Sequence, residues 1–129
     1  MLEEVVKKLK AEIDKLKIVQ RDYHKALAQR QQLDGQLNEN VVVKEELDLL
    51  SPESEVFKLI GPVLIKQDLN EAKQNVAKRV EYISAELKRV EDTIPDLDKK
   101  QESLREVVNE LEDVFVEERL KATVKAFFK

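Results

Sequence analysis

The sequence predicts a mainly α fold, a long antiparallel coiled-coil hairpin of two helices with one central β-hairpin. Two helical heptad patterns run through the 129 residues, and a short β-rich insert separates them. The chain has only two glycines and three prolines, and 39% of it is charged. This composition is typical of long helices that bury one narrow seam rather than a broad core. We therefore expect a single domain over residues 1–129.

The first helix is expected over about residues 2–48. Positions spaced alternately four and three residues apart fall on one stripe of a helix, as a coiled-coil seam requires. Nine of twelve such positions are apolar. Two of the three exceptions, Arg30 and Asp34, lie near Leu33, so we expect the seam to shift by one residue there. The twelve positions are Leu2, Val6, Leu9, Ile13, Leu16, Gln20, Tyr23, Leu27, Arg30, Asp34, Leu37 and Val41.

A β-hairpin is expected over about residues 56–66, after a loop at Ser51–Ser54. Two runs of β-branched, aliphatic and aromatic residues flank the breaker Gly61-Pro62. Because side chains alternate along a strand, both faces of this hairpin carry apolar groups. An isolated hairpin is marginal in water and leaves its edges unpaired, so we expect it to pack on the base of the coil and to mediate oligomerisation. The residues of this oligomerisation hairpin are Val56, Phe57, Leu59, Ile60, Val63, Leu64 and Ile65.

The second helix is expected over about residues 68–120. Twelve of fourteen seam positions are apolar, a stronger pattern than in the first helix. Pro95 interrupts the helix and should cost about 3 kcal/mol there. The seam continues across it, so we predict a kink with the seam preserved rather than a break. The seam positions are Leu69, Lys73, Val76, Val80, Ile83, Leu87, Val90, Ile94, Leu97, Gln101, Leu104, Val108, Leu111 and Phe115.

The charge pattern favours intramolecular pairing and excludes several partners. Residues 1–25 hold seven basic and five acidic groups, whereas residues 98–121 hold five basic and eight acidic, so the two ends attract in an antiparallel hairpin. The net charge of −4 gives no electrostatic reason to bind nucleic acid. No apolar run reaches the roughly 20 residues of a membrane span, and the first residues lack a signal-peptide pattern. We expect a cytoplasmic protein with no membrane partner.

No residue pattern predicts catalysis, a metal or a cofactor. His24 is the single histidine and there is no cysteine, so a metal site has too few ligands. Acidic pairs such as Glu45-Glu46 and Glu117-Glu118 are expected to be solvated coil surface rather than acid-base groups. The phosphate-binding and nucleophile motifs with fixed glycine spacing are missing. We predict that the chain is not an enzyme.

The chain after Phe115 departs from a plain coil. It carries Val116, Leu120, Val124 and the pair Phe127-Phe128 beyond the point that the first helix should reach. Exposed apolar groups at the free end of a solvated arm suggest adhesion to something apolar. A frayed or folded-back terminus is the alternative.

Four segments carry a resemblance to a known family. Residues 40–47, 56–67, 71–72 and 78–83 resemble those of β-class prefoldin subunits, and the block VFKLIGPVLIKQ is the most specific of them. The resemblance implies a hetero-hexamer of α- and β-class prefoldin subunits whose hairpins form an oligomeric β-barrel base with six coiled-coil arms. It also implies an ATP-independent chaperone in protein folding that binds unfolded proteins such as actin and tubulin and delivers them to the cytosolic group II chaperonin.

The same resemblance places a client-binding tip at the ends of the two helices. The alternative is a coiled-coil scaffold or tether that oligomerises through its β-hairpin but binds no unfolded protein. Suppression of aggregation of a denatured client without ATP distinguishes the two. The predicted tip residues are Leu2, Val5, Val6, Leu9, Leu104, Val108, Leu111, Phe115, Val116, Leu120, Val124, Phe127 and Phe128.

Overall fold

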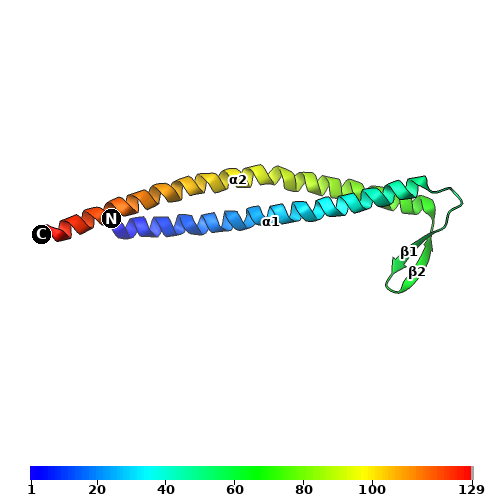
Figure 1. Ribbon diagram of the computed structural model, residues 1–129, viewed down its shortest axis with the longest axis horizontal. Coiled ribbons are helices and arrows are strands. Elements are labelled where there is room, and N and C mark those ends of the chain that lie inside the picture. The colour runs from blue at the N-terminus through cyan, green and yellow to red at the C-terminus, as the bar shows by residue number, and fades with distance from the viewer. Residues whose placement is uncertain (129) are drawn as a thin grey trace. The chain divides into compact units, whose positions relative to one another are not determined.

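Two long helices flank a β-hairpin along the chain. The computed structural model describes residues 1–128, with α1 at Leu2–Leu49, β1 at Val56–Ile60, β2 at Val63–Gln67 and α2 at Leu69–Phe127 (Figure 1). The chain forms two compact units. We name them the terminal unit, which is Met1–Leu27 with the chain from Asp92 onward, and the hairpin unit, which is Ala28–Glu91. In each unit a segment of α1 lies alongside an antiparallel segment of α2 (Figure 1).

The seam of α2 follows the predicted heptad at every position. All fourteen predicted seam residues are buried or half-buried, including the two polar ones. Lys73 is half-buried, and Gln101 is 6% exposed with no hydrogen-bond partner for its Oε1 atom. Because the apolar spacing stays regular from Leu69 to Phe115, these residues share one stripe of α2.

The seam of α1 departs from the predicted heptad at two places. Ten of the twelve predicted positions are half-buried, while Val6 and Asp34 are exposed. Their neighbours Val5 and Leu33 are half-buried instead. The expected shift at Leu33 is therefore confirmed, and a similar shift occurs at the start of the helix. A three-residue and a four-residue step both keep a side chain on one stripe, so the sequence spacing permits either phase there.

The hairpin is attached to the coil by a tight loop and a capped helix start. Pro52 disfavours helix at the residue before it, and Ser54 N–H donates to the Ser51 carbonyl at 3.0 Å, which closes a turn after α1. Asp68 then caps α2, because its Oδ2 accepts a hydrogen bond from the Glu71 N–H at 3.2 Å. A small cluster beneath the hairpin consists of Leu47, Leu69, Ala72 and Val76, with Val56 and Val80 packed against it.

The two strands pair antiparallel about a glycine turn. The turn residues Gly61 and Pro62 join the paired residues Ile60 and Val63. Gly61 has a φ of 57°, a conformation that costs glycine little free energy because it has no Cβ. The register pairs Val56 with Gln67 and Lys58 with Ile65. One face of the hairpin, here the inner face, carries Val56, Lys58, Ile60, Val63, Ile65 and Gln67. The opposite face, here the outer face, carries Phe57, Leu59, Leu64 and Lys66.

The end of α2 lies further along the chain than the sequence predicts. The sequence predicts an end near residue 120, but the helix continues to Phe127. Lys121 pairs with Glu117 at 3.7 Å and with Glu118 at 3.8 Å, and such pairs one turn apart support a helix. No glycine or proline follows Pro95 to stop it. A frayed or folded-back terminus is therefore wrong for the described part of the tail.

Pro95 lies inside a continuous α2, so the alternative of a break between two helices is wrong. Its own side chain is exposed, and the seam residues Ile94 and Leu97 on either side are half-buried. The proline ring thus lies off the seam. Its cost falls on the backbone, because it cannot donate a hydrogen bond to the carbonyl of Glu91 and its ring crowds that carbonyl.

Replacing Pro95 with alanine restores that hydrogen-bond donor. We expect Pro95→Ala to raise helicity and to stabilise the chain by up to about 3 kcal/mol, since packing already offsets part of the strain. Thermal unfolding followed by circular dichroism measures this. Asp96→Ala is the matched control, because it alters an exposed neighbour without adding a donor. Equal melting temperatures for the two variants contradict the prediction.

Candidate interaction surfaces

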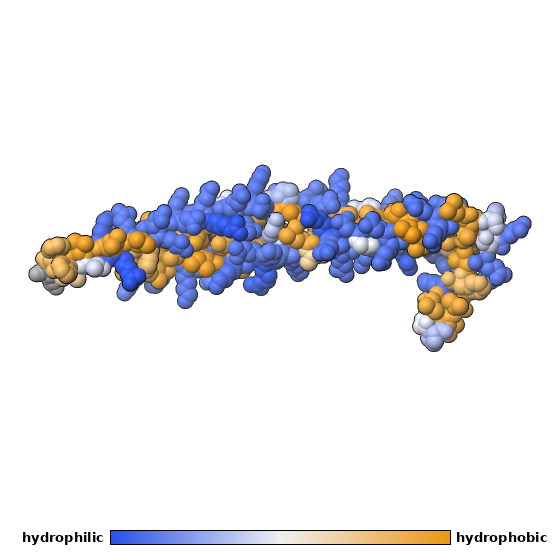
Figure 2. All heavy atoms as spheres, viewed as in Figure 1, coloured by the Kyte–Doolittle hydropathy of each residue, from blue (hydrophilic) through white to orange (hydrophobic). Residues whose placement is uncertain are grey.

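The hairpin exposes apolar side chains on both faces. Of its seven predicted residues only Val56 is half-buried, because it packs on the cluster below. The other six are about half exposed or more, and Figure 2 shows apolar residues covering much of the hairpin. Such a contiguous apolar surface marks an interaction site. The six residues are Phe57 (50% exposed), Leu59 (68%), Ile60 (52%), Val63 (54%), Leu64 (65%) and Ile65 (48%).

The hairpin also presents two free backbone edges. Among residues 1–128, β1 and β2 form a two-stranded sheet, so the outer edge of each strand has no strand beside it. Unpaired N–H and C=O groups along an edge are a template for pairing with another chain. The one ion pair at this site, Lys66 with Glu55 at 3.6 Å, is largely exposed and is worth little. Apolar faces and open edges together suit the addition of strands from a neighbouring molecule.

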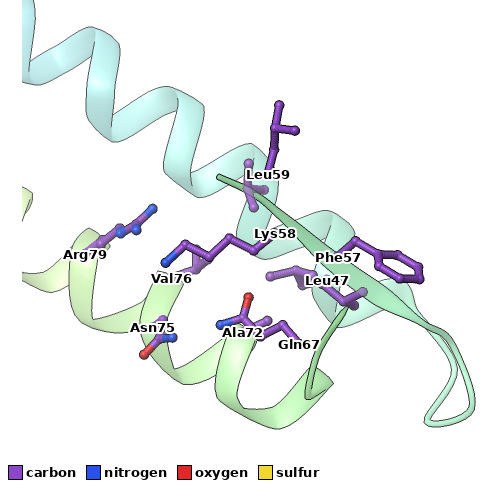
Figure 3. Close-up of a pocket in the computed structure, with 11 residues that line it drawn as sticks. Leu47, Phe57, Lys58, Leu59, Gln67, Ala72, Asn75, Val76 and Arg79 are labelled. Atoms are coloured by element: carbon purple, nitrogen blue, oxygen red, sulfur yellow. The ribbon is translucent and has the colours of Figure 1, made fainter. Parts of the chain in front are cut away.

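A hollow of about 280 Å³ lies between the root of the hairpin and the two helices of the hairpin unit (Figure 3). Its apolar wall includes Val43, Leu47 and Val76, and its polar groups include Lys58 and Arg79. The sequence prediction did not include these two cations. The available signal was Lys58, the single charged residue in a strand of otherwise apolar residues.

The predicted tip residues fall into two sets within the terminal unit. One set lies on the seam: Leu2, Val5, Leu9, Leu104, Leu111 and Phe115 are half-buried, and Val108 is buried. The second set is exposed and consists of Val6, Val116, Leu120, Val124, Phe127 and Phe128. Only the second set offers surface to a partner while α1 and α2 stay paired.

The exposed tail residues lie on the side of α2 away from the seam. Successive residues of a helix are rotated by roughly 100°, which places Val116, Leu120 and Phe127 roughly 80–140° around the helix from the seam residues Val108 and Phe115. The helix end that carries them extends beyond the start of α1 (Figure 1). A longer α1 would therefore leave this stripe uncovered. We name Val116, Leu120, Val124, Phe127 and Phe128 the outward stripe.

His24 and the Arg89–Glu86 pair lie outside these surfaces and offer no further site. His24 is exposed and lies edge-on to Tyr23, with ring centroids 5.9 Å apart. Arg89 donates a hydrogen bond of 2.8 Å to Glu86, and this bond lowers the pKa of the Glu86 carboxyl. No group of three or more metal-ligating side chains gathers within residues 1–128. No helix in the same range combines the length and the apolar character needed to cross a membrane.

The sequence profile of the family described as "Prefoldin subunit" matches residues 10–113. The chain belongs to the prefoldin subunit family. Prefoldin subunit 6 of Mus musculus is 47% identical over 115 residues, a match that covers 89% of this chain and 91% of the relative. Prefoldin subunit 6 of Arabidopsis thaliana is 50% identical over 94 residues, 73% of each chain. The likeness to β-class prefoldin, and within it to eukaryotic subunit 6, is thereby confirmed.

A solved prefoldin structure has the same fold. The prefoldin beta subunit from Thermococcus strain KS-1 superposes with a TM-score of 0.69, over 80% of this chain and 90% of that one, at 19% identity. This match confirms the predicted coiled-coil hairpin with one β-hairpin. The prefoldin profile includes the whole β-hairpin but ends before the outward stripe begins at Val116. The family match therefore covers the hairpin surface but not the outward stripe.

Proposed function

We propose that this chain is one subunit of a hetero-hexameric, ATP-independent co-chaperone of the cytoplasm. It assembles with α- and β-class prefoldin subunits through its β-hairpin. It binds unfolded client proteins of the actin and tubulin kind at the tip of its coil and delivers them to the cytosolic group II chaperonin. The observation that carries this proposal is the open, apolar hairpin in a chain of the prefoldin family.

Assembly through the hairpin would cover its exposed apolar faces and its unpaired edges. Two strands alone bury too little apolar surface to be stable in water. Val56 is the one hairpin residue that packs on the cluster beneath them. Strands added at both edges satisfy the unpaired backbone groups, and closure into a barrel removes the edges altogether. The same step covers both apolar faces, which accounts for side chains such as Leu59 and Leu64 that have no cover in the subunit.

Client binding is supported by the exposure of the outward stripe. Its five residues are between about half and four-fifths exposed, and the rings of Phe127 and Phe128 pack edge to face with centroids 5.3 Å apart. A single stripe of this kind binds weakly, but several arms that hold one client gain affinity by multivalency. A shallow apolar surface suits varied unfolded chains better than a shaped pocket does.

Charge on the hairpin should abolish assembly. Phe57→Asp with Ile65→Asp places one carboxylate on each face, where neighbouring strands have to bury it, so we expect a helical chain that stays outside the complex. Native mass spectrometry of the chain co-expressed with other prefoldin subunits measures this, and circular dichroism checks the helices.

The matched control for the hairpin variant is Val42→Asp with Tyr82→Asp, at positions that are 52% and 69% exposed on the helices. It adds the same charge away from the hairpin and should assemble as the unchanged chain does. Normal incorporation of the hairpin variant into the complex would contradict the proposed mode of assembly.

Removing the outward stripe should weaken client capture but leave assembly intact. Truncation after Phe115 deletes the stripe, and Leu120→Ser with Phe127→Ser alters it without shortening the helix. We expect client affinity to fall by roughly tenfold or less, because other arms still bind. The measurement is suppression of aggregation of denatured actin, without ATP, by complexes that carry each variant.

Ala122→Ser with Ala126→Ser is the control for the stripe, because these residues lie on the same tail but toward the seam side. Equal suppression by both serine variants would move client binding inward to the seam residues. Assembly without suppression by any complex would favour a scaffold or tether instead.

A further inference from the structure

The hollow beside the hairpin lies along one strand. Four successive residues of β1, Val56 to Leu59, line it, whereas β2 contributes only Gln67. Among residues 1–128 the outer edge of β1 has no partner strand. A strand that pairs with this edge therefore runs past the opening of the hollow and can place one of its side chains inside.

The hollow holds two cations and no acid. Lys58 reaches in from the inner face of β1 and Arg79 from α2, and their charged ends point toward one another in Figure 3. The residues around them are apolar or neutral. Within the described chain neither cation has an ion-pair partner, although the nearby Lys66 pairs with Glu55 at 3.6 Å. Two like charges beside an apolar wall repel, and an anion between them relieves that repulsion.

We infer that this hollow receives an aspartate or glutamate side chain from the prefoldin subunit that adds its strand to β1. The inference rests on the proposed assembly through the hairpin. The planar guanidinium of Arg79 can hold a carboxylate with two parallel hydrogen bonds, and the Lys58 ammonium adds a third. Val43, Leu47 and Val76 exclude water from one side of this contact, which strengthens it.

The main effect of such a contact is the choice of neighbour. The apolar hairpin faces attract any strand with matching apolar residues, so they discriminate poorly between related subunits. A neighbour without the acid leaves Lys58 and Arg79 covered and unpaired, which penalises the wrong pairing. The two cations thus determine which subunit lies beside β1.

A carbodiimide cross-link tests the contact directly, because this reagent joins an amine to a carboxylate only where the two already touch. In the complex of the full chain with other prefoldin subunits, we expect Lys58 to be linked to an acidic residue of a neighbouring subunit. The link between Lys66 and Glu55 of the chain itself is the internal positive control. If that control forms while Lys58 stays unlinked, or links only within its own chain, the inference is wrong.

Neutral variants test the choice of neighbour. Lys58→Met and Arg79→Met remove the charge and keep a flexible apolar stem, so the complex should still form. We expect each to weaken the bond to the neighbour by roughly tenfold at low ionic strength, and less at high ionic strength. Lys78→Met is the matched control, since it removes an exposed cation next to Arg79 that does not line the hollow. Native mass spectrometry at both ionic strengths follows the complex.

The outcomes separate this inference from the proposed function. If the unchanged chain does not assemble at all, the proposed function fails. If it assembles and both methionine variants match Lys78→Met at each ionic strength, only the inference about the hollow fails. If Lys58 forms no link to a subunit, and inorganic phosphate binds the complex only while Lys58 and Arg79 are unchanged, the hollow belongs to a free anion and the inference is overturned.

Discussion

The structure depends on burial along one narrow seam. The buried apolar residues are small or medium in size, and no side chain in the described chain is fully enclosed. A highly charged chain with so few aromatic residues has no other way to remove apolar surface from water. One consequence is that the hairpin has only a small cluster to rest on, centred on Leu47 and Ala72. Its remaining apolar surface is left for other molecules because the coil has no face broad enough to cover it.

A polar residue interrupts this seam in the terminal unit. Gln101 is buried, and its Oε1 atom has no hydrogen-bond partner. A buried amide in a coiled-coil seam lowers stability but restricts the alignments that two helices can adopt. In a seam built mainly from Leu, Ile and Val residues, such a position favours one axial alignment of α1 and α2. Alignment matters here because it determines how far the end of α2 projects.

Most of the fold could be predicted from the sequence, and the misses have local causes. The seam of α2 was predictable at every position because apolar spacing alone determines it. The choice of Val5 over Val6 was not predictable, since both satisfy helical spacing. The end of α2 was missed because the helix continues past the last seam residue, Phe115, with no glycine or proline to stop it. That Lys58 and Arg79 line the same hollow could not be predicted, because it depends on how the hairpin lies against α2.

The hairpin residues were predicted as a group, and their exposure agrees with a role between molecules. The tip stays a prediction: the sequence indicated apolar residues near the start of α1 and the end of α2 but not which of them face solvent. Helical rotation separates them. Leu104 and Leu111 hold the two helices together, whereas Leu120 and Phe127 lie on the far side of α2 and take no part in that pairing.

The open hairpin has a cost for the cell as well as a use. A newly made copy carries two unpaired edges and six uncovered apolar residues until other subunits arrive, and such a strand pair is an aggregation hazard. An orphan copy thus displays the kind of surface by which quality-control machinery recognises misfolded proteins. Excess synthesis of this subunit should therefore end in degradation rather than in a free pool, so its abundance is set by the supply of the subunits that cover its hairpin.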